Sequence, residues 1–461
     1  MTDAHRFDPT VLREYDIRGI VGETLSAADA RAVGRGFGSA VVAAGGAKVA
    51  LGRDGRLSSP ELASAVAAGL ASCGLEVTEI GVGPTPMLYF TVCEYGYDGG
   101  VMVTGSHNPA EYNGFKMMLG RKSFWGKDIQ ALGRRATAGD FARGAGKTGQ
   151  RKVADAYVAR LLRDYKAGRP LNVVWDGGNG AAGDIMTALT KQLPGRHTLL
   201  NAEIDGRFPA HHPDPTVEKN LDQLRVAVRD KKADVGIAFD GDADRIGVVD
   251  GQGRILWGDQ ILAVLARDVL AERPGAIVMA DVKASQVLFD EVARLGGQPL
   301  MWRTGHSIIK TKMAETGAPL AGEMSGHIFF ADTWYGFDDA LYAAVRLLSL
   351  LSRQPKSLAE LRDALPQAVN TPELRFPCRE DRKFAVVDEV KARLTTAGAT
   401  FSDVDGVRVS TADGWWLLRA SNTQDVLVAR CEAADEAGLA RLKSALMSAV
   451  KASGIAPPAD L

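Results

Sequence analysis

The stretch DVGIAFDGDADRIGVVD contains three carboxylates at a spacing of two residues, Asp240, Asp242 and Asp244. The apolar run before them is typical of a buried strand, so the carboxylates follow the carboxyl end of a strand, where α/β sheets place their sites. Three carboxylates this close repel one another unless a cation lies among them, and all-oxygen ligands suit Mg²⁺. A polar turn is one alternative, and an aspartyl-phosphate nucleophile at Asp240 is another; the ligand pattern of an EF-hand is missing.

A second stretch, VMVTGSHNPAEYNGFK, passes from an apolar, strand-like run into a cluster that can continue neither a strand nor a helix. Gly105 permits backbone angles that other residues avoid, and Pro109 restricts the residue before it. The hydroxyl of Ser106 and the imidazole of His107 are therefore presented on a loop, with Lys116 close by in the sequence. A serine hydrolase is the weaker alternative, because the G-x-S-x-G elbow is absent.

Two further stretches combine polar groups that suit sugar hydroxyls or a phosphate. LAGEMSGHIFF places Glu323, Ser325 and His327 between apolar runs, as acceptors and donors for hydroxyl groups. LLRASNTQDVLV places a cation, two hydroxyls and an amide in a turn between two strands, which would make a phosphate cradle. The members of this turn are Arg419, Ser421, Asn422 and Thr423. Either stretch alone is also compatible with a structural role, as a satisfied histidine or as a tight hairpin with a surface arginine.

Weaker signals surround these motifs. MWRTGHSIIK places His306 directly after a glycine at a predicted helix start, and REYDIRGIVGE offers Tyr15 and Arg18 near another glycine. DGGNGAAGD contains the spacing G-x-G-x-x-G between a predicted strand and a predicted helix. We discount a dinucleotide site there, because any short turn from a strand to a helix needs similar glycines.

Short β-branched runs that alternate with longer Ala- and Leu-rich segments must position these loops. The alternation is clear in residues 47–82, 171–193 and 276–297, and it implies right-handed crossovers and mostly parallel sheets. From about Pro366 the pattern changes to consecutive antiparallel strands followed by one helix. We expect three related α/β units with mixed, mostly parallel sheets and a C-terminal α+β domain, with a linker or exposed connection at residues 136–152.

The composition excludes several classes of protein. The chain has 461 residues, of which 46% are hydrophobic and 24% charged, and a net charge of −1, so nothing indicates a nucleic-acid surface. No run reaches the ~18 apolar residues of a membrane span, and MTDAHRFDPT lacks the regions of a signal peptide. The four cysteines show no metal-binding spacing. We expect a cytoplasmic protein, a monomer or weak dimer, without nucleic-acid or membrane partners.

In this order, TGSHNP, DGDADR, GEMSGH and RASNT resemble the motifs of the α-D-phosphohexomutase superfamily, most closely those of its bacterial phosphomannomutase/phosphoglucomutase branch. The resemblance covers essentially the whole chain, from EYDIRG to RASNT. It implies four domains around a central cleft, three α/β units and a C-terminal domain of the TATA-binding-protein-like type. We place them at residues 1–152, 153–254, 255–367 and 368–461, carrying in turn the phosphoserine, metal-binding, sugar-recognition and phosphate-binding loops.

The resemblance also implies roles for individual residues. Ser106 would carry a phosphoryl group and would bind Mg²⁺ together with the three aspartates of the acidic loop. Glu323 and Ser325 would bind sugar hydroxyls, and the residues of RASNT would hold the phosphate that is not reacting. Further active-site positions are matched by Tyr15, Arg18, His107, Lys116, Arg245, Lys283, His306 and His327. One departure is visible, because related loops often continue with a proline after the threonine, whereas Gln424 and Asp425 follow here.

The implied activity interconverts hexose 1-phosphate and hexose 6-phosphate, of glucose and mannose, through a phosphoserine and a hexose 1,6-bisphosphate that turns over in the cleft. Glucose 1,6-bisphosphate would be activator and intermediate, with Lys116 and His306 as candidate proton carriers. Glu323 and Ser325 would contact hydroxyls 3 and 4, which glucose and mannose share, so we expect weak activity on galactose phosphate. The alternatives are an aspartyl-phosphate enzyme acting through Asp240 and a phosphosugar-binding protein without activity.

Overall fold

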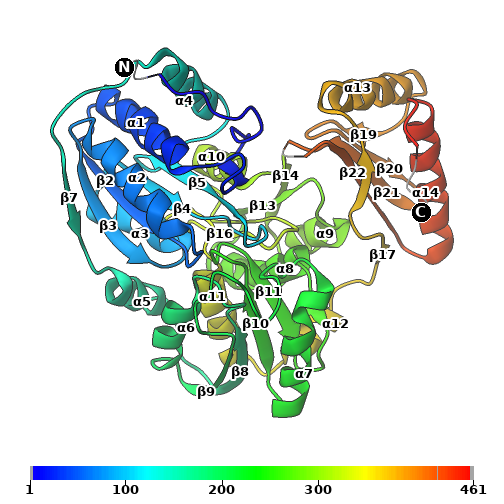
Figure 1. Cartoon of the computed structure of the whole chain (residues 1–461). Coiled ribbons are helices and arrows are strands. Elements are labelled where there is room, and N and C mark those ends of the chain that lie inside the picture. Colours follow the sequence, from blue (N-terminus) through cyan, green and yellow to red (C-terminus); the bar gives the residue numbers. More distant parts are fainter. Residues whose placement is uncertain (1–3, 423, 457–461) are drawn as a thin grey trace.

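The structure is a computed structural model and describes residues 4–422 and 424–456 of the chain. This part forms three α/β domains followed by a C-terminal α+β domain (Figure 1), which confirms the predicted fold class. In these residues no helix is long and apolar enough to cross a membrane. Helix α11 (Ala340–Ser352), of which every residue is buried, lies in the third domain, where Arg346 pairs with Asp332 at 2.7 Å.

The first domain contains seven strands and four helices. These are β1 (Ile17–Ile20), β2 (Lys48–Arg53), β3 (Glu76–Val82), β4 (Gly99–Val103), β5 (Tyr112–Leu119), β6 (Lys122–Ser123), β7 (Lys147–Gln150), α1 (Ala27–Ala43), α2 (Ser59–Ala71), α3 (Thr85–Tyr95) and α4 (Lys127–Ala138). The strand order is β1-β5-β4-β2-β3-β7, with β6 paired to β5. Strands β4, β2, β3 and β7 run parallel, and every residue of the central strand β4 is buried.

Residues 136–152, which we expected to be a linker or exposed connection, contain regular secondary structure. This segment contains the end of α4 and the edge strand β7, which pairs in parallel with β3. All side chains of β7 are exposed, so apolar periodicity could not indicate the strand, and only its main-chain pairing defines it.

The second domain has a five-stranded sheet in the order β12-β11-β10-β8-β9. Its elements are α5 (Ala154–Leu162), β8 (Leu171–Asp176), α6 (Gly183–Thr190), β9 (Gly195–Leu200), the 3-10 helix η1 (Glu218–Leu221), α7 (Asp222–Lys231), β10 (Val235–Phe239), β11 (Ile246–Asp250) and β12 (Ile255–Leu256). Strands β8, β9 and β10 are parallel, whereas β10 and β11 form an antiparallel hairpin. The turn of this hairpin is the acidic loop.

The third domain has a four-stranded sheet in the order β14-β13-β15-β16. Its elements are α8 (Gly258–Glu272), β13 (Ile277–Asp281), α9 (Gln286–Arg294), β14 (Gln298–Trp302), α10 (His306–Thr316), β15 (Leu320–Gly322), β16 (Ile328–Phe330), α11 and α12 (Leu358–Asp363). The antiparallel pair β15 and β16 encloses the stretch GEMSGH, and β13 ends just before Lys283.

The fourth domain has an antiparallel sheet in the order β17-β22-β21-β20-β19, with β18 also paired to β22. Its elements are β17 (Val369–Asn370), β18 (Leu374–Pro377), α13 (Glu380–Thr396), β19 (Phe401–Ser402), β20 (Val407–Thr411), β21 (Gly414–Ala420), β22 (Val426–Ala433) and α14 (Glu436–Lys451). The turn between β21 and β22 carries the stretch RASNT. This domain has an apolar core of its own, whereas one large core joins helix α3 to the second and third domains.

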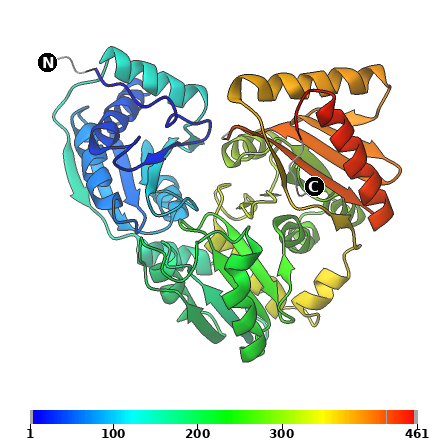
Figure 2. The same ribbon diagram turned by 45° about the vertical axis from the view of Figure 1, so that its right-hand side comes forward.

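The four domains are arranged so that the last returns toward the first. Figure 2 shows the fourth domain, in orange and red, opposite the first domain, in blue, with the second and third domains below and behind them. The loops that follow β4, β10 and β15 contact one another, and the β21–β22 turn contacts the first domain through Tyr15. Contacts between side chains of different domains, described next, define this meeting point.

Candidate active site

Ser106 lies directly after the buried strand β4 and is itself buried, with 1% of its surface exposed. Its backbone adopts a left-handed conformation with φ of 50°, which is unfavourable for a residue with a Cβ. The sequence attributes the unusual backbone angle to Gly105, but the structure places it at Ser106. Gly105 is required for another reason, because a Cβ at this position would lie 2.4 Å from Cζ of Arg56.

The Ser106 hydroxyl faces the acidic loop of the second domain. Its Oγ lies 3.2 Å from Oδ2 of Asp240 and 3.2 Å from Nδ1 of His107. Burial lowers the pKa of His107 well below its usual range, and the positive charges of Arg245 and Arg18 lower it further. His107 is therefore a neutral neighbour of the serine at pH 7.

The three aspartates of the acidic loop are completely buried, and one oxygen of each lies within 4.8 Å of the others. Lys116 of β5 reaches them from the first domain: its Nζ donates to Oδ2 of Asp242 at 2.7 Å and to Asp244. Oδ1 of Asp240 accepts the N–H groups of Asp244 and Arg245, each at 3.1 Å. The loop thus holds three carboxylates against one ammonium group.

The charges of this cluster are incompletely balanced. Burial alone would lower the pKa of Lys116, but Asp242 and Asp244 reverse this effect and raise it well above its usual range. Burial raises the pKa of Asp240 well above its usual range, and the charges of Asp242 and Asp244 raise it further. Burial would also raise the pKa of Asp244, but Lys116 and His327 hold it well below. The surroundings therefore favour the charged form of Asp244 and disfavour that of Asp240.

The donor set fits a divalent cation. Oδ1 of Asp242 is buried and, within the described residues, has no hydrogen-bond partner. An unpartnered carboxylate oxygen is costly to bury unless a ligand completes it. Carboxylate oxygens are also the ligands that Mg²⁺ prefers, together with phosphate oxygens and water.

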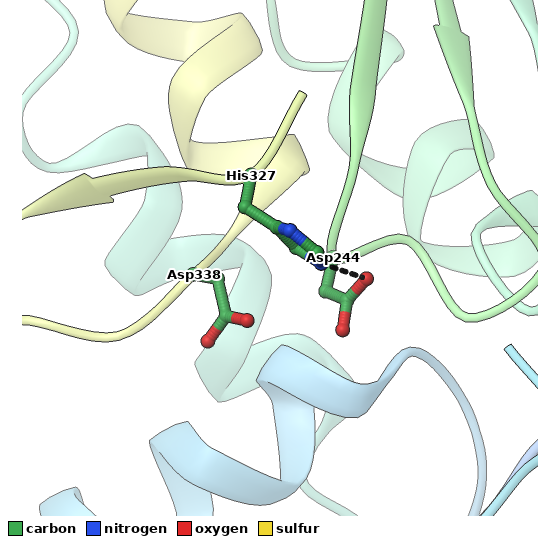
Figure 3. Close-up of side chains that lie close together, drawn as sticks. All are labelled: Asp244, His327 and Asp338. Carbon is green, nitrogen blue, oxygen red and sulfur yellow. Dashed lines mark ion pairs between the residues drawn. The ribbon is translucent and has the colours of Figure 1, made fainter. Parts of the chain in front are cut away.

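His327 connects the acidic loop to the stretch GEMSGH. Figure 3 shows its imidazole beside Asp244 with Asp338 below, and its Nε2 lies 3.2 Å from Oδ1 of Asp244. Its Nδ1 lies 3.0 Å from Oε2 of Glu323. Burial would lower the pKa of His327, but these two carboxylates raise it to about 9. Because an imidazolium cannot ligate a metal and Lys310 pairs with Asp338 at 2.8 Å, we interpret Asp244, His327 and Asp338 as an ionic network.

The predicted sugar-recognition residues lie around this network. Oε1 of Glu323 accepts the N–H of Gly305 at 2.7 Å, and Ser325 Oγ lies 3.0 Å from Nδ1 of His327. Burial would raise the pKa of Glu323, but the hydrogen bond and charge of His327 lower it to about 2. His306 begins helix α10 and stacks on His327 with ring centroids 5.5 Å apart. Burial lowers the pKa of His306, and Lys310 lowers it further.

The predicted phosphate loop of the fourth domain reaches the first domain through Tyr15. The hydroxyl of Tyr15 donates to the carbonyl of Thr304 at 2.9 Å and accepts from Nδ2 of Asn422 at 2.6 Å. One side chain therefore bridges the first, third and fourth domains. Nε of Arg419 donates to Asp405 at 3.0 Å.

Other residues of the predicted site form hydrogen bonds and ion pairs within the third and fourth domains. Oγ of Ser421 accepts the N–H of Gln424 at 3.2 Å, and Thr423 lies outside the described residues. Lys283 pairs with Glu373 at 3.2 Å and lies 3.9 Å from Asp281. The carbonyl of Asp425, which departs from the family pattern, accepts the N–H of Cys378 at 2.9 Å.

Some residues of the site were missed by sequence reasoning. Arg18 was predicted, and it donates to Oδ1 of Asn108 and to Asp16, neither of which was singled out. The network around His327 also depends on Asp338, and the phosphoserine loop depends on Arg56. The stretch GRDGR at the end of β2 was a possible signal for Arg56, because two arginines and an aspartate lie at the carboxyl end of a strand.

The fold and this site define the class of the protein: a four-domain α/β phosphotransferase in which a serine faces a candidate metal centre. Four family models match the chain in succession. They are described as phosphoglucomutase/phosphomannomutase, alpha/beta/alpha domains I, II and III and C-terminal domain, and they match residues 9–142, 155–253, 257–369 and 373–449.

Individual relatives match over nearly the whole chain. A phosphomannomutase/phosphoglucomutase of Pseudomonas aeruginosa is 44% identical, with 96% of each chain covered. A phosphoglucomutase of Neisseria gonorrhoeae is 43% identical over 96% of this chain and 97% of its own. The crystal structure of a phosphoglucomutase/phosphomannomutase family protein from Burkholderia thailandensis superposes with a TM-score of 0.93 at 45% identity, covering 98% of this chain and 99% of that chain. The chain belongs to the phosphoglucomutase/phosphomannomutase family.

Proposed function

We propose that the chain interconverts hexose 1-phosphates and hexose 6-phosphates of glucose and mannose, with Ser106 as the residue that carries the phosphoryl group. The observation that carries this proposal is the position of the Ser106 hydroxyl, 3.2 Å from Oδ2 of Asp240 at the edge of a buried carboxylate cluster. Family membership supports the same reaction class.

In the proposed reaction the phosphate loop holds the phosphate that does not react. Arg419, Ser421 and Asn422 supply a guanidinium, a hydroxyl and an amide for this purpose, while Glu323 and Ser325 orient the sugar through its hydroxyls. The 6-hydroxyl then attacks the phosphorus of phospho-Ser106, the bond from Ser106 Oγ to phosphorus breaks, and a hexose 1,6-bisphosphate forms. The bisphosphate turns over, and its 1-phosphoryl group returns to Ser106, which leaves hexose 6-phosphate.

Two residues divide the work of handling protons and charge. His306 is neutral at pH 7 because burial lowers its pKa, so it can accept the proton of the attacking hydroxyl. Lys116 keeps its proton between two carboxylates and supplies positive charge beside the serine. A Mg²⁺ ion held by Asp240, Asp242 and Asp244 would neutralise phosphoryl oxygens and make the phosphorus more electrophilic.

Peptide mapping by mass spectrometry after incubation with glucose 1,6-bisphosphate and Mg²⁺ tests the proposal. We expect one added phosphoryl group on Ser106, its absence in Ser106→Ala, and its retention in the control Ser448→Ala on the exposed face of α14. A phosphoryl group on Asp240 would transfer the chemistry to the acidic loop. No phosphoryl group on either residue would leave a phosphosugar-binding protein without mutase activity.

Coupled assays with three sugar phosphates test the substrate range. Glu323 and Ser325 are proposed to contact hydroxyls 3 and 4, and galactose inverts the second of these. Glucose 1-phosphate and mannose 1-phosphate should therefore be converted, and galactose 1-phosphate only weakly. Equal turnover of galactose 1-phosphate would refute the assignment of these two residues without affecting the assignment of Ser106.

A further inference from the structure

Arg56, between β2 and α2, uses every N–H donor of its guanidinium inside the protein. Nε donates to Oδ2 of Asp54 at 3.2 Å, and the other four donors reach main-chain carbonyls of the phosphoserine loop. These carbonyls belong to Ser106 at 2.8 Å, Asn108 at 2.6 Å, Tyr112 at 3.0 Å and Pro109. A guanidinium has five N–H groups in a fixed planar fork, so donor number and acceptor number match.

The position of Arg56 excludes direct contact with a substrate. Its side chain is 0% exposed and lies beneath the loop. Gly105 packs directly on the guanidinium, and the ring of Phe208 from the second domain lies 5.0 Å from Cζ on another side. Arg56 can therefore act on the reaction only through the loop that it holds.

Asp54 binds donor groups of the same loop, whereas Arg56 binds its carbonyls. Its Oδ2 accepts the hydroxyl of Thr104 at 2.9 Å and the N–H of Gly105 at 3.1 Å. The hydroxyl of Thr104 in turn accepts the N–H of Ser106 at 2.8 Å. The Asp54–Arg56 pair thus holds both the donors and the acceptors of the backbone around Ser106.

The Ser106 carbonyl that Arg56 holds is also in contact with the acidic loop. A Cβ added to Gly241 would lie 2.2 Å from this carbonyl oxygen, so the main chains of the two loops touch there. Ser106 is in the left-handed region, where an L-residue stays only when its surroundings hold it. Arg56 therefore holds the carbonyl group through which the serine loop contacts the acidic loop.

We infer that Arg56 is a positioning residue for phosphoryl transfer, which keeps the Ser106 hydroxyl aimed at the acidic loop through both halves of the reaction. This inference rests on the proposed function of Ser106. Lysine cannot replace Arg56, because an ammonium has three donors and no planar fork, which leaves at least two of the five acceptors without a partner.

Steady-state kinetics of Arg56→Lys and Arg56→Met test the inference. A displacement of the reacting group by about 1 Å can cost about 100-fold in rate, so we expect kcat to fall by that order in Arg56→Met and less in Arg56→Lys. The KM for glucose 1-phosphate should stay within about threefold, because the groups proposed to bind the sugar and its phosphate are on other domains. Unchanged kcat, or a raised KM with unchanged kcat, would overturn the inference.

Hydrogen exchange of the peptide covering residues 104–116 supplies a readout that does not depend on activity. Arg56→Lys should exchange faster in this peptide, whereas Arg346→Lys, the same substitution at another buried arginine, should not. Loss of kcat to the same degree in both variants would mean a general loss of folding and would also overturn the inference. If wild-type protein acquires no phosphoryl group on Ser106, the proposed function fails first; if it does and Arg56→Lys behaves as wild type, only the positioning role fails.

Discussion

Asp339 places a carboxyl group in a buried position at the start of α11, where ionisation is unfavourable. Its Oδ1 accepts the N–H of Tyr342 at 2.9 Å, and its Oδ2 accepts the hydroxyl of Tyr157, from the second domain, at 2.8 Å. Burial raises the pKa of this carboxyl from 3.8 to about 7. We predict that Asp339→Asn increases resistance to unfolding at pH 8 and has a smaller effect at pH 5.

The sign and size of this effect follow from proton linkage. A carboxyl with a higher pKa in the folded state binds more protons when folded, so its contribution to stability falls as pH rises. The loss begins near pH 3.8 and is complete above about pH 7, and this difference corresponds to at most about 4 kcal/mol. Asparagine avoids the loss, because its amide cannot ionise, still caps a helix and can donate to the Tyr157 hydroxyl.

Urea unfolding followed by tryptophan fluorescence between pH 5 and 8 measures the effect. The midpoint of Asp339→Asn should move away from that of wild type as pH rises to about 7 and then remain at a constant separation. The matched control is Asp435→Asn, the same change at the exposed N-cap of α14. A separation for Asp339→Asn that is equal at every pH, or that favours wild type at pH 8, would refute burial as the cause.

Three further predictions concern the candidate site. Lys116→Met removes an ammonium group that a bound divalent cation must approach, and unit charges about 4 Å apart repel by about 4 kcal/mol at an effective dielectric of 20. Calorimetry at pH 8 should therefore show at least about tenfold tighter Mn²⁺ binding to the variant. Equal or weaker binding would contradict the cation site. Tyr15→Phe loses its hydrogen bonds to Thr304 and Asn422, each of about 1 kcal/mol, so the KM for hexose phosphates should rise about fivefold or more, whereas an unchanged KM would deny the bridge a role in binding. Arg419→Lys should raise the KM for hexose 1-phosphate and hexose 6-phosphate by a similar factor, about tenfold, because one loop is proposed to hold either phosphate; an effect on only one substrate would require a second phosphate site.

The parts of the site that the sequence could indicate are those formed by short stretches. The three aspartates follow β10 directly, and Ser106 follows β4, so an apolar run and the polar residues after it were enough to predict both loops. His306 at the start of α10 was also predicted from a short stretch, in which a glycine precedes a helical pattern.

The parts that the sequence could not indicate depend on contacts between distant segments. Arg56 and the Ser106 carbonyl are 50 residues apart, and Tyr15 and Asn422 are 407 residues apart, so no local spacing relates them. The sequence also could not show why residue 105 must be a glycine, because the guanidinium of Arg56 that packs against it comes from another loop. The edge strand β7 shows that pairing through the main chain alone also leaves no apolar pattern.

The order of the four domains along the chain has a consequence for biosynthesis. The Tyr15 side chain is made 407 residues before its partner Asn422, and the bridge between them also includes the third domain. A growing chain that has completed three domains has the serine and the acidic loop but no loop to hold the second phosphate of a sugar. If the proposed function is correct, nascent chains and fragments without the fourth domain are therefore unable to turn over hexose phosphates. The activity then arises only after the fourth domain has been made and has folded against the other three.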